Sequence, residues 1–132
     1  MKLLLDTHFV IWWLANSPRM SSQTRQRIAE SDCVISTVSL IEIRMKIAAG
    51  KLTPPAGASA SAARQLGSEG FGVLPLTPEH VDESARFEQA HNDVFDRLLL
   101  GTAAAGNFTL LTRDAALLAL AKKAKLAWVT EG

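Results

Sequence analysis

Five carboxylates stand out because they could act together chemically although they come from distant parts of the chain. They are Asp6, Glu42, Asp93, Asp96 and Asp114. Carboxylates held close together disfavour one another's ionised forms, so a cluster of them needs a cation at neutral pH. Oxygen ligands select a hard cation, Mg²⁺ or Mn²⁺, which retains waters and accepts phosphate oxygens. The reaction class indicated is metal-assisted phosphodiester hydrolysis.

A structural interpretation competes with this one. Three of the acids directly precede an expected helix and could simply cap its N-terminus: Asp6, Asp93 and Asp114. Asp96, three residues after Asp93, would favour the same helix start through the helix dipole. Glu42 lies inside an expected helix, where it could pair with Lys46 four residues on. Only the joint pattern favours a site.

The elements that must position these acids alternate along the chain. Met1–Asp6 is a continuous apolar run that ends on a carboxylate, which is typical of a strand buried on both faces of a parallel sheet. Further strands are expected at Cys33–Ile35, Gly72–Leu76, Phe108–Thr112 and, at an edge, Ala127–Val129. Helices are expected at Thr7–Ala15, Ser21–Ser31, Val38–Ala49, Pro78–Glu88 and Val94–Ala105, and after Asp114 through Lys122; a loop at 53–57 leads into a weak helix that ends near Leu66.

This alternation predicts an α/β fold, a parallel sheet with helices on both faces. Ligands of such sheets gather outside the carboxyl ends of the strands. Asp6 and Asp114 should therefore leave the sheet at one edge, with the helix start that carries Asp93 and Asp96 beside them. Several negative charges would then share one small volume.

Composition limits the possibilities without choosing a function. The 132 residues, 48% hydrophobic and 20% charged, suit one globular domain spanning residues 1–132. The single Cys33 suggests a reducing compartment and a small buried side chain. The N-terminal apolar run is too short for a signal peptide, and no run approaches the roughly 20 residues of a membrane span. We therefore expect a cytoplasmic protein without membrane contact.

Other chemistries lack their residues in this sequence. His8, His80 and His91 show no metal-ligand spacing and are expected at helix starts or in packing. No Ser/His/Asp order, phosphate-binding loop or dinucleotide glycine motif is present. A haloacid-dehalogenase-type phosphatase would need a second Asp at the position of His8.

Four ordered segments, LLLDTHFVIWWL, VSLIEI, HNDVFDRLLLGTA and LLTRD, resemble PIN-domain ribonucleases of the VapC toxin type over nearly the whole chain. The resemblance implies that Asp6, Glu42 and Asp96 are the principal metal-binding acids and that Asp114 is the fourth. Asp93 matches an additional acid of one branch of the family, and its role is open.

The resemblance also implies a three-layer α/β/α domain around a parallel sheet and an Mg²⁺- or Mn²⁺-dependent endoribonuclease activity. The implied partners are an RNA substrate, a VapB-type antitoxin and a second copy of the chain in a homodimer. Two positions depart from this branch: Val94 stands where proline is frequent, and Ile41 where tryptophan is frequent. Neither departure removes a predicted ligand.

The charge balance fits a polyanionic substrate. Outside the five acids, 8 Asp and Glu remain against 14 Lys and Arg, so the rest of the chain carries about +6 although the net charge is +1. Arg97 and Arg113 are candidate phosphate contacts, whereas Lys122, Lys123 and Lys125 have a helix C-terminus as their simpler explanation. Thr7, Ser39 and Thr112 lie beside the acids and could orient a carboxylate or a metal-bound water.

Two other functions stay open on the sequence. One is an RNA-processing nuclease with the same chemistry and no antitoxin. The other is a nuclease-like module that binds protein or RNA without turnover, although the intact acids argue against it.

Overall fold

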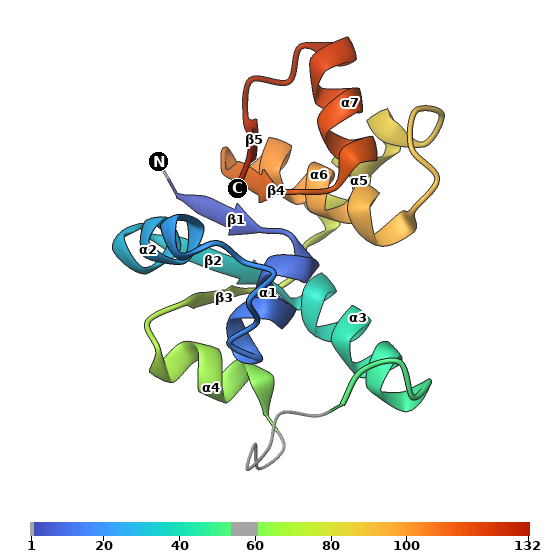
Figure 1. The fold of residues 1–132 in the computed structure, drawn as a ribbon. Helices are drawn as coiled ribbons and strands as arrows, with labels where there is room; N and C mark the ends of the chain where they lie inside the picture. The colour runs from blue at the N-terminus through green and yellow to red at the C-terminus, as the bar shows by residue number, and fades with distance from the viewer. Residues whose placement is uncertain (1, 54–60) are drawn as a thin grey trace.

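The computed structural model describes residues 2–53 and 61–132, and its centre is a five-stranded sheet (Figure 1). The strands are β1 (Leu3–Leu5), β2 (Cys33–Ser36), β3 (Gly72–Leu74), β4 (Thr109–Thr112) and β5 (Val129–Glu131). Their order is β3-β2-β1-β4-β5, and every neighbouring pair is parallel. The predicted parallel sheet is confirmed, with the Leu run of β1 as its central strand.

Helices connect consecutive strands, as parallel pairing requires. They are α1 (Thr7–Leu14), α2 (Ser22–Glu30), α3 (Thr37–Ala48), α4 (Ala62–Ser68), α5 (Pro78–Ser84), the 3₁₀ helix η1 (Ala85–Phe87), α6 (Val94–Gly106) and α7 (Ala115–Ala124). A Ser, Thr or Asp side chain accepts a backbone N–H at the start of each of these α-helices. Helix starts are therefore well specified by the sequence.

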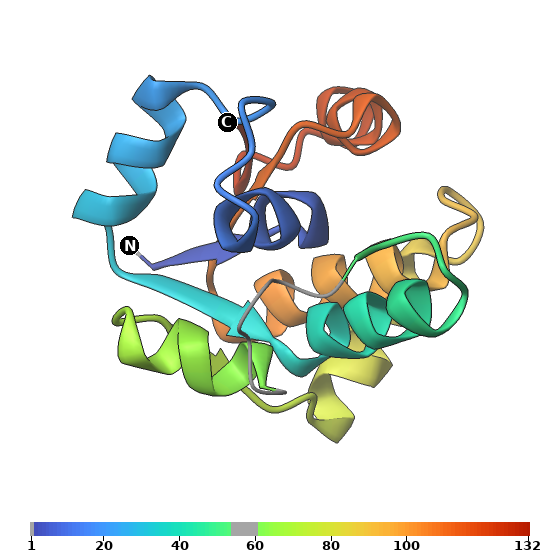
Figure 2. The same ribbon diagram turned by 60° about the horizontal axis from the view of Figure 1, so that its bottom comes forward.

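Two apolar layers cover the sheet, because successive strand side chains point to opposite faces. Leu3 and Leu5 of β1 pack into one core with Phe9 of α1, whereas Leu4 belongs to a second core with Leu99 of α6. Burying one such Leu fully contributes about 1.5–3 kcal/mol. Figure 2 shows α1 on one face of the sheet and α3 beside α6. The three-layer α/β/α fold is confirmed.

Some expected boundaries are wrong by a few residues. The strand expected at Gly72–Leu76 ends at Leu74, because Pro75 has no N–H to donate to the sheet. The helix expected at Pro78–Glu88 is α-helical only through Ser84 and continues as η1.

The ends of the last two helices and the position of the last strand also differ from the prediction. α6 and α7 run one or two residues beyond their expected ends and close on Asn107 (φ 57°) and Lys125 (φ 56°), both left-handed. After Lys125 the chain turns, so the edge strand expected at Ala127–Val129 instead spans Val129–Glu131.

Three further expectations concern composition and local structure. Cys33 is buried in the core, and burial raises the pKa of its thiol to about 11. The expected loop at 53–57 and the first part of the weak helix lie mostly outside the described residues; the helix there is α4. None of the helices in residues 2–53 and 61–132 combines the length and the apolar character needed to cross a bilayer.

Candidate active site

Sheet register sets Asp6 beside Thr112 at the carboxyl edge of the central strands. Leu5 of β1 pairs with Leu111 of β4, and the Asp6 backbone N–H donates to the Leu111 carbonyl at 3.0 Å. The Thr112 hydroxyl donates to Asp6 Oδ2 at 2.5 Å. Asp6 is only 2% exposed and Thr112 is fully buried, so this bond is protected from water. The prediction that Thr112 orients a carboxylate is confirmed.

Asp114 is tied to the same hydroxyl through its backbone. Its N–H donates to Thr112 Oγ1 at 3.1 Å, and its own Oδ1 accepts from the Leu117 N–H at 2.9 Å, which caps α7. One buried Thr side chain thus links the two strand ends that carry Asp6 and Asp114. The prediction that these two acids leave the sheet at one edge is confirmed.

Asp6 is held in its ionised form despite its burial. Burial, the largest single influence, raises its pKa, but the His8 imidazole, the Thr112 hydroxyl and the His8 backbone N–H together lower the pKa below its ordinary value. The His8 N–H donates to Asp6 Oδ1 at 3.2 Å, and the imidazole Nδ1 lies 3.7 Å from the same oxygen. Asp6 is therefore a fixed negative charge at neutral pH.

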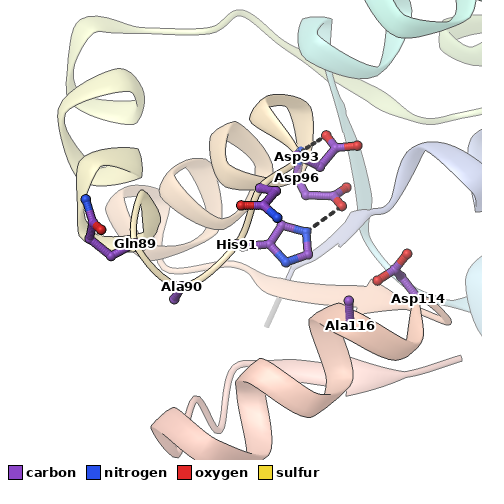
Figure 3. A pocket seen from close by; sticks show the side chains of 8 residues that line it. Gln89, Ala90, His91, Asp93, Asp96, Asp114 and Ala116 are labelled. Carbon is purple, nitrogen blue, oxygen red and sulfur yellow. Dashed lines mark hydrogen bonds and ion pairs between the residues drawn. The ribbon is translucent and has the colours of Figure 1, made fainter.

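The start of α6 supplies two more carboxylates. Asp93 Oδ1 accepts from the Asp96 N–H at 3.0 Å, so Asp93 caps the helix as its structural interpretation predicted. Asp96 lies in the first turn, and its Oδ2 is 2.8 Å from His91 Nε2. The His91 and Asp96 side chains are 9% and 16% exposed. Figure 3 shows this contact and the cap together.

Asp96 has the opposite electrostatic character to Asp6. The pKa of Asp96 is raised to about 6, chiefly by burial and further by the charges of Asp93, Asp6 and Asp114, while the hydrogen bond with His91 opposes the rise. Asp93, Asp96 and Asp114 line one pocket, in which Asp96 and Asp114 point into the same space (Figure 3). The predicted meeting of the strand ends with the start of α6 is confirmed.

The cap interpretation is also confirmed for Asp6, Asp93 and Asp114, each of which accepts a backbone N–H at a helix start. Each cap uses only one of the two oxygens of its carboxylate, so capping does not occupy the second oxygen. Among the described residues, Asp93 Oδ2 and Asp114 Oδ2 have no hydrogen-bond partner. A cap and a ligand are therefore compatible roles for the same side chain.

Glu42 stands at the margin of this cluster. It is half-buried on α3 and makes no hydrogen bond or ion pair with the described residues; in particular the alternative pair with Lys46 is not formed within 4 Å. The pKa of His8 is raised, chiefly by Asp6 and more weakly by the charge of Glu42. The charge of Glu42 therefore acts on the imidazole that lies beside Asp6.

The predicted phosphate contacts are engaged with backbone carbonyls. Arg97 Nη1 donates to the carbonyls of His91 and Asn92 at 2.9 and 3.0 Å, and Arg113 Nη1 donates to the Arg19 carbonyl at 3.0 Å. Both guanidinium groups have further N–H donors, so their role toward phosphate stays a prediction.

The hydroxyls of Thr7 and Ser39 bond to one another at 2.9 Å in the interior and join α1 to α3. Their predicted action on a metal-bound water stays untested.

His91 is the residue that the sequence interpretation undervalued. The lack of metal-ligand spacing gave no reason to select it, yet its imidazole contacts Asp96 directly. The available signal was its place two residues before the Asp93 cap, in a segment short enough to fold back on the first helical turn. His80, by contrast, is a helix-start residue as expected and accepts the Thr77 N–H at 3.2 Å.

The donor chemistry of the site fits a hard divalent cation. The clustered side chains are all carboxylates, and the charges of Asp93, Asp6 and Asp114 add to burial in raising the pKa of Asp96. Among residues 2–53 and 61–132, no three Asp, Glu, His or Cys side chains already surround a common ion position.

A parallel α/β/α sheet with carboxylates gathered at its carboxyl edge defines the class of this protein. Within that class, the chain belongs to the PIN domain family, whose sequence model matches residues 3–123. A comparison with curated proteins gives no match.

Three solved structures share the fold. DNA-bound VapBC from Salmonella typhimurium has a TM-score of 0.65 at 15% identity over 100% of this chain and 97% of the other. A toxin–antitoxin complex from Klebsiella pneumoniae has a TM-score of 0.63 at 16% identity, over 97% of this chain and 95% of the other. VapBC2 from Rickettsia felis, bound to a DNA fragment from its promoter, has a TM-score of 0.61 at 16% identity, over 100% of this chain and 98% of the other.

Proposed function

We propose that this PIN-domain protein is a metal-dependent endoribonuclease that hydrolyses RNA phosphodiester bonds and acts as the toxin of a toxin–antitoxin pair. The observation that carries the proposal is the convergence of Asp6, Asp96 and Asp114, from three separate elements, at one edge of the sheet. Their mutual repulsion, felt most by Asp96, is relieved by a cation. An arrangement built only for capping would not require these acids to meet.

The cofactor is Mg²⁺ or Mn²⁺. Asp6, Asp96 and Asp114 are the central ligands, with Glu42 from α3 and Asp93 from the start of α6 at the margins. When bound, the ion lowers the pKa of a water and stabilises the leaving oxygen of the phosphodiester. Thr112 keeps the Asp6 carboxylate in place, and the lowered pKa of Asp6 keeps it ionised for the ion.

We infer an RNA substrate, and the charge distribution suits a polyanion of this kind. Asp93, Asp96 and Asp114 line the pocket, while the chain outside the five acids carries about +6, which suits a polyanion held by its phosphates. Arg97 and Arg113 retain N–H donors after their bonds to the backbone. They are the residues that we expect to contact phosphate beside the pocket.

The antitoxin is inferred from the solved relatives, because three structures with this fold are toxin–antitoxin or VapBC complexes. We infer a VapB-type partner, a homodimer and a cytoplasmic place of action. A gene beside this one that encodes a small DNA-binding protein, and that suppresses the toxicity of this chain on co-expression, would support the pair. Nuclease activity without such a partner would favour an RNA-processing enzyme instead.

The test of the activity uses purified protein with labelled RNA. Cleavage should require Mg²⁺ or Mn²⁺, stop on addition of chelator, and fall by more than about 100-fold in Asp6→Asn and Asp96→Asn, since even outer-shell partners of a metal typically cost 10–100-fold. Glu30→Gln, on the exposed face of α2, is the matched control and should keep full activity. Cleavage that survives both Asp variants would contradict the mechanism. Absence of divalent-ion binding by the wild type would favour a non-catalytic binding module.

A further inference from the structure

The segment from His91 to Asp93 folds back on the first turn of α6. His91 Nε2 lies 2.8 Å from Asp96 Oδ2, and the His91 side chain is 9% exposed. Asp96 Oδ1 has no hydrogen-bond partner among the described residues. The imidazole therefore engages one oxygen of this carboxylate and leaves the other for a ligand.

The direction of this hydrogen bond follows from the chemistry of the two groups. An ionised carboxylate can only accept, so Nε2 is the donor whenever Asp96 carries its charge. A donor within the low-dielectric surroundings of a half-buried pair restricts the rotation of the carboxylate.

Arg97 and the backbone hold the loop that carries the imidazole. Arg97 Nη1 donates to the carbonyls of both His91 and Asn92, at 2.9 and 3.0 Å. The His91 N–H donates to the carbonyl of the buried Phe87 at 3.1 Å. The loop is thus fixed from the helix that follows it and from the turn that precedes it.

We propose that His91 is a positioning residue, which orients the Asp96 carboxylate for a divalent cation, and that Arg97 locks the loop that carries it. The inference rests on the proposed function, because it assigns His91 its role through the metal site. It also gives Arg97 a task beside its predicted contact with phosphate.

Mn²⁺ alone, titrated into the full chain without RNA, is the probe for this role. Removing a partner that orients a metal ligand typically costs 10–100-fold in affinity. We expect His91→Ala to raise the Mn²⁺ dissociation constant by about that factor. His91→Gln retains an N–H donor and should recover a substantial part of the affinity. A residue needed only for packing would give no such rescue.

His80→Ala is the matched control. His80 is also buried at a helix start, but within residues 2–53 and 61–132 the hydrogen bonds of its side chain and its N–H join it only to Thr77. Its removal should lower the melting temperature of the metal-free protein while leaving the Mn²⁺ dissociation constant unchanged. His91→Ala should show the reverse pattern, a small thermal effect and a large loss of metal affinity.

The role of Arg97 in holding the His91 loop is tested by comparing Arg97→Ala with Arg86→Ala. Arg86 is exposed; its guanidinium pairs with Glu83 at 3.0 Å and lies over the ring of Phe87. Arg97→Ala should weaken Mn²⁺ binding in the same direction as His91→Ala, and little more when the two are combined, because they act on one group. Arg86→Ala should bind Mn²⁺ as the wild type does.

The outcomes separate the two ideas. Wild-type Mn²⁺ affinity in both His91→Ala and His91→Gln would overturn the positioning role and leave the metal site standing, provided that Asp96→Asn loses binding. Wild-type affinity in Asp96→Asn would overturn the assigned metal site itself. If His91→Ala fails to fold, equal weakening in His91→Gln and His80→Gln would overturn the positioning role.

Discussion

The two sides of the acidic site hold their carboxylates in different ways. On the strand side, Asp6 lies at the end of a central strand, accepts hydrogen bonds from the Thr112 hydroxyl and the His8 N–H, and has a lowered pKa. On the helix side, Asp96 lies in the first turn of α6, receives its hydrogen bond from a loop residue, and has a pKa raised to about 6.

The difference teaches what a cation would contribute at each side. Asp6 is ionised and fixed in advance, so it provides a charged anchor. Asp96 ionises against its surroundings, so a bound cation stabilises it more and competes with a proton for it. Metal affinity should accordingly decline as pH falls below about 6, where Asp96 becomes protonated.

Addition of metal should give the largest change in stability. A ligand that binds only the folded state stabilises it by about 2.7 kcal/mol at 100 times its dissociation constant. Saturating Mn²⁺ should therefore raise the melting temperature at pH 7.5, and chelator should reverse the rise. The gain should be much smaller at pH 4.5, where Asp96 holds its proton. An equal gain at both pH values would contradict the proposed competition.

Asp96→Asn should stabilise the metal-free protein. Because the folded pKa of Asp96, about 6, lies above the unfolded value, the free energy of unfolding falls as pH rises from about 4 to 6. The shift corresponds to about 2–3 kcal/mol above pH 7. Asparagine escapes this cost, so chemical denaturation at pH 7.5 should show a gain that disappears near pH 4.

Asp6→Asn should change the stability of the metal-free protein in the opposite direction to Asp96→Asn. The lowered pKa of Asp6 means that its ionised form stabilises the fold at neutral pH, and that this contribution is lost as pH falls through the folded pKa. The Asn variant should therefore be less stable than the wild type at pH 7.5. Changes of the same sign in Asp6→Asn and Asp96→Asn would remove the distinction between the two sides.

The sequence predicted the strand side more fully than the helix side for a physical reason. A buried Leu run and parallel pairing fix where a strand ends, so the approach of Asp6 to Asp114 followed from topology. The contact between His91 and Asp96 depends on the path of a short irregular segment. No periodic pattern encodes that path.

The same distinction explains the errors at element ends. Pro75 is visible in the sequence, but the left-handed conformations of Asn107 and Lys125 depend on how each helix meets the next strand. Lys125 in particular has no intrinsic preference that would announce a helix end. The position of β5 was therefore missed, whereas the existence of an edge strand was predicted.

Thr112→Val tests the link between Asp6 and Asp114 on the strand side. The substitution keeps the shape but removes the donor to Asp6, in the interior, and the acceptor of the Asp114 N–H, which is partly buried. Loss of such buried partners costs about 1–3 kcal/mol. Denaturant unfolding should show that loss, together with weaker Mn²⁺ binding. Thr112→Ser retains the hydroxyl and should stay close to the wild type.

Glu42→Gln should have a smaller effect, because Glu42 reaches the cluster only through His8 in the described structure. We expect RNA cleavage at limiting Mn²⁺ to fall about tenfold, equivalent to about 1.4 kcal/mol. Saturating Mn²⁺ should recover most of the rate. A loss as large as that of Asp6→Asn would instead make Glu42 a central ligand, drawn into the site when metal binds.

Asp93→Asn should have the smallest effect of these substitutions. Asparagine caps a helix about as well as aspartate, so the bond to the Asp96 N–H survives and stability should change by less than about 0.5 kcal/mol. The variant loses one of the charges that raise the pKa of Asp96, so a carboxyl NMR titration should place that pKa closer to its ordinary value. Cleavage should stay within about threefold of the wild type, whereas Asp93→Ala should cost about 1 kcal/mol of stability through loss of the cap. A loss of cleavage in Asp93→Asn comparable to that in Asp96→Asn would make Asp93 a central ligand as well as a cap, and would move the helix side of the site one turn toward the loop that His91 and Arg97 hold.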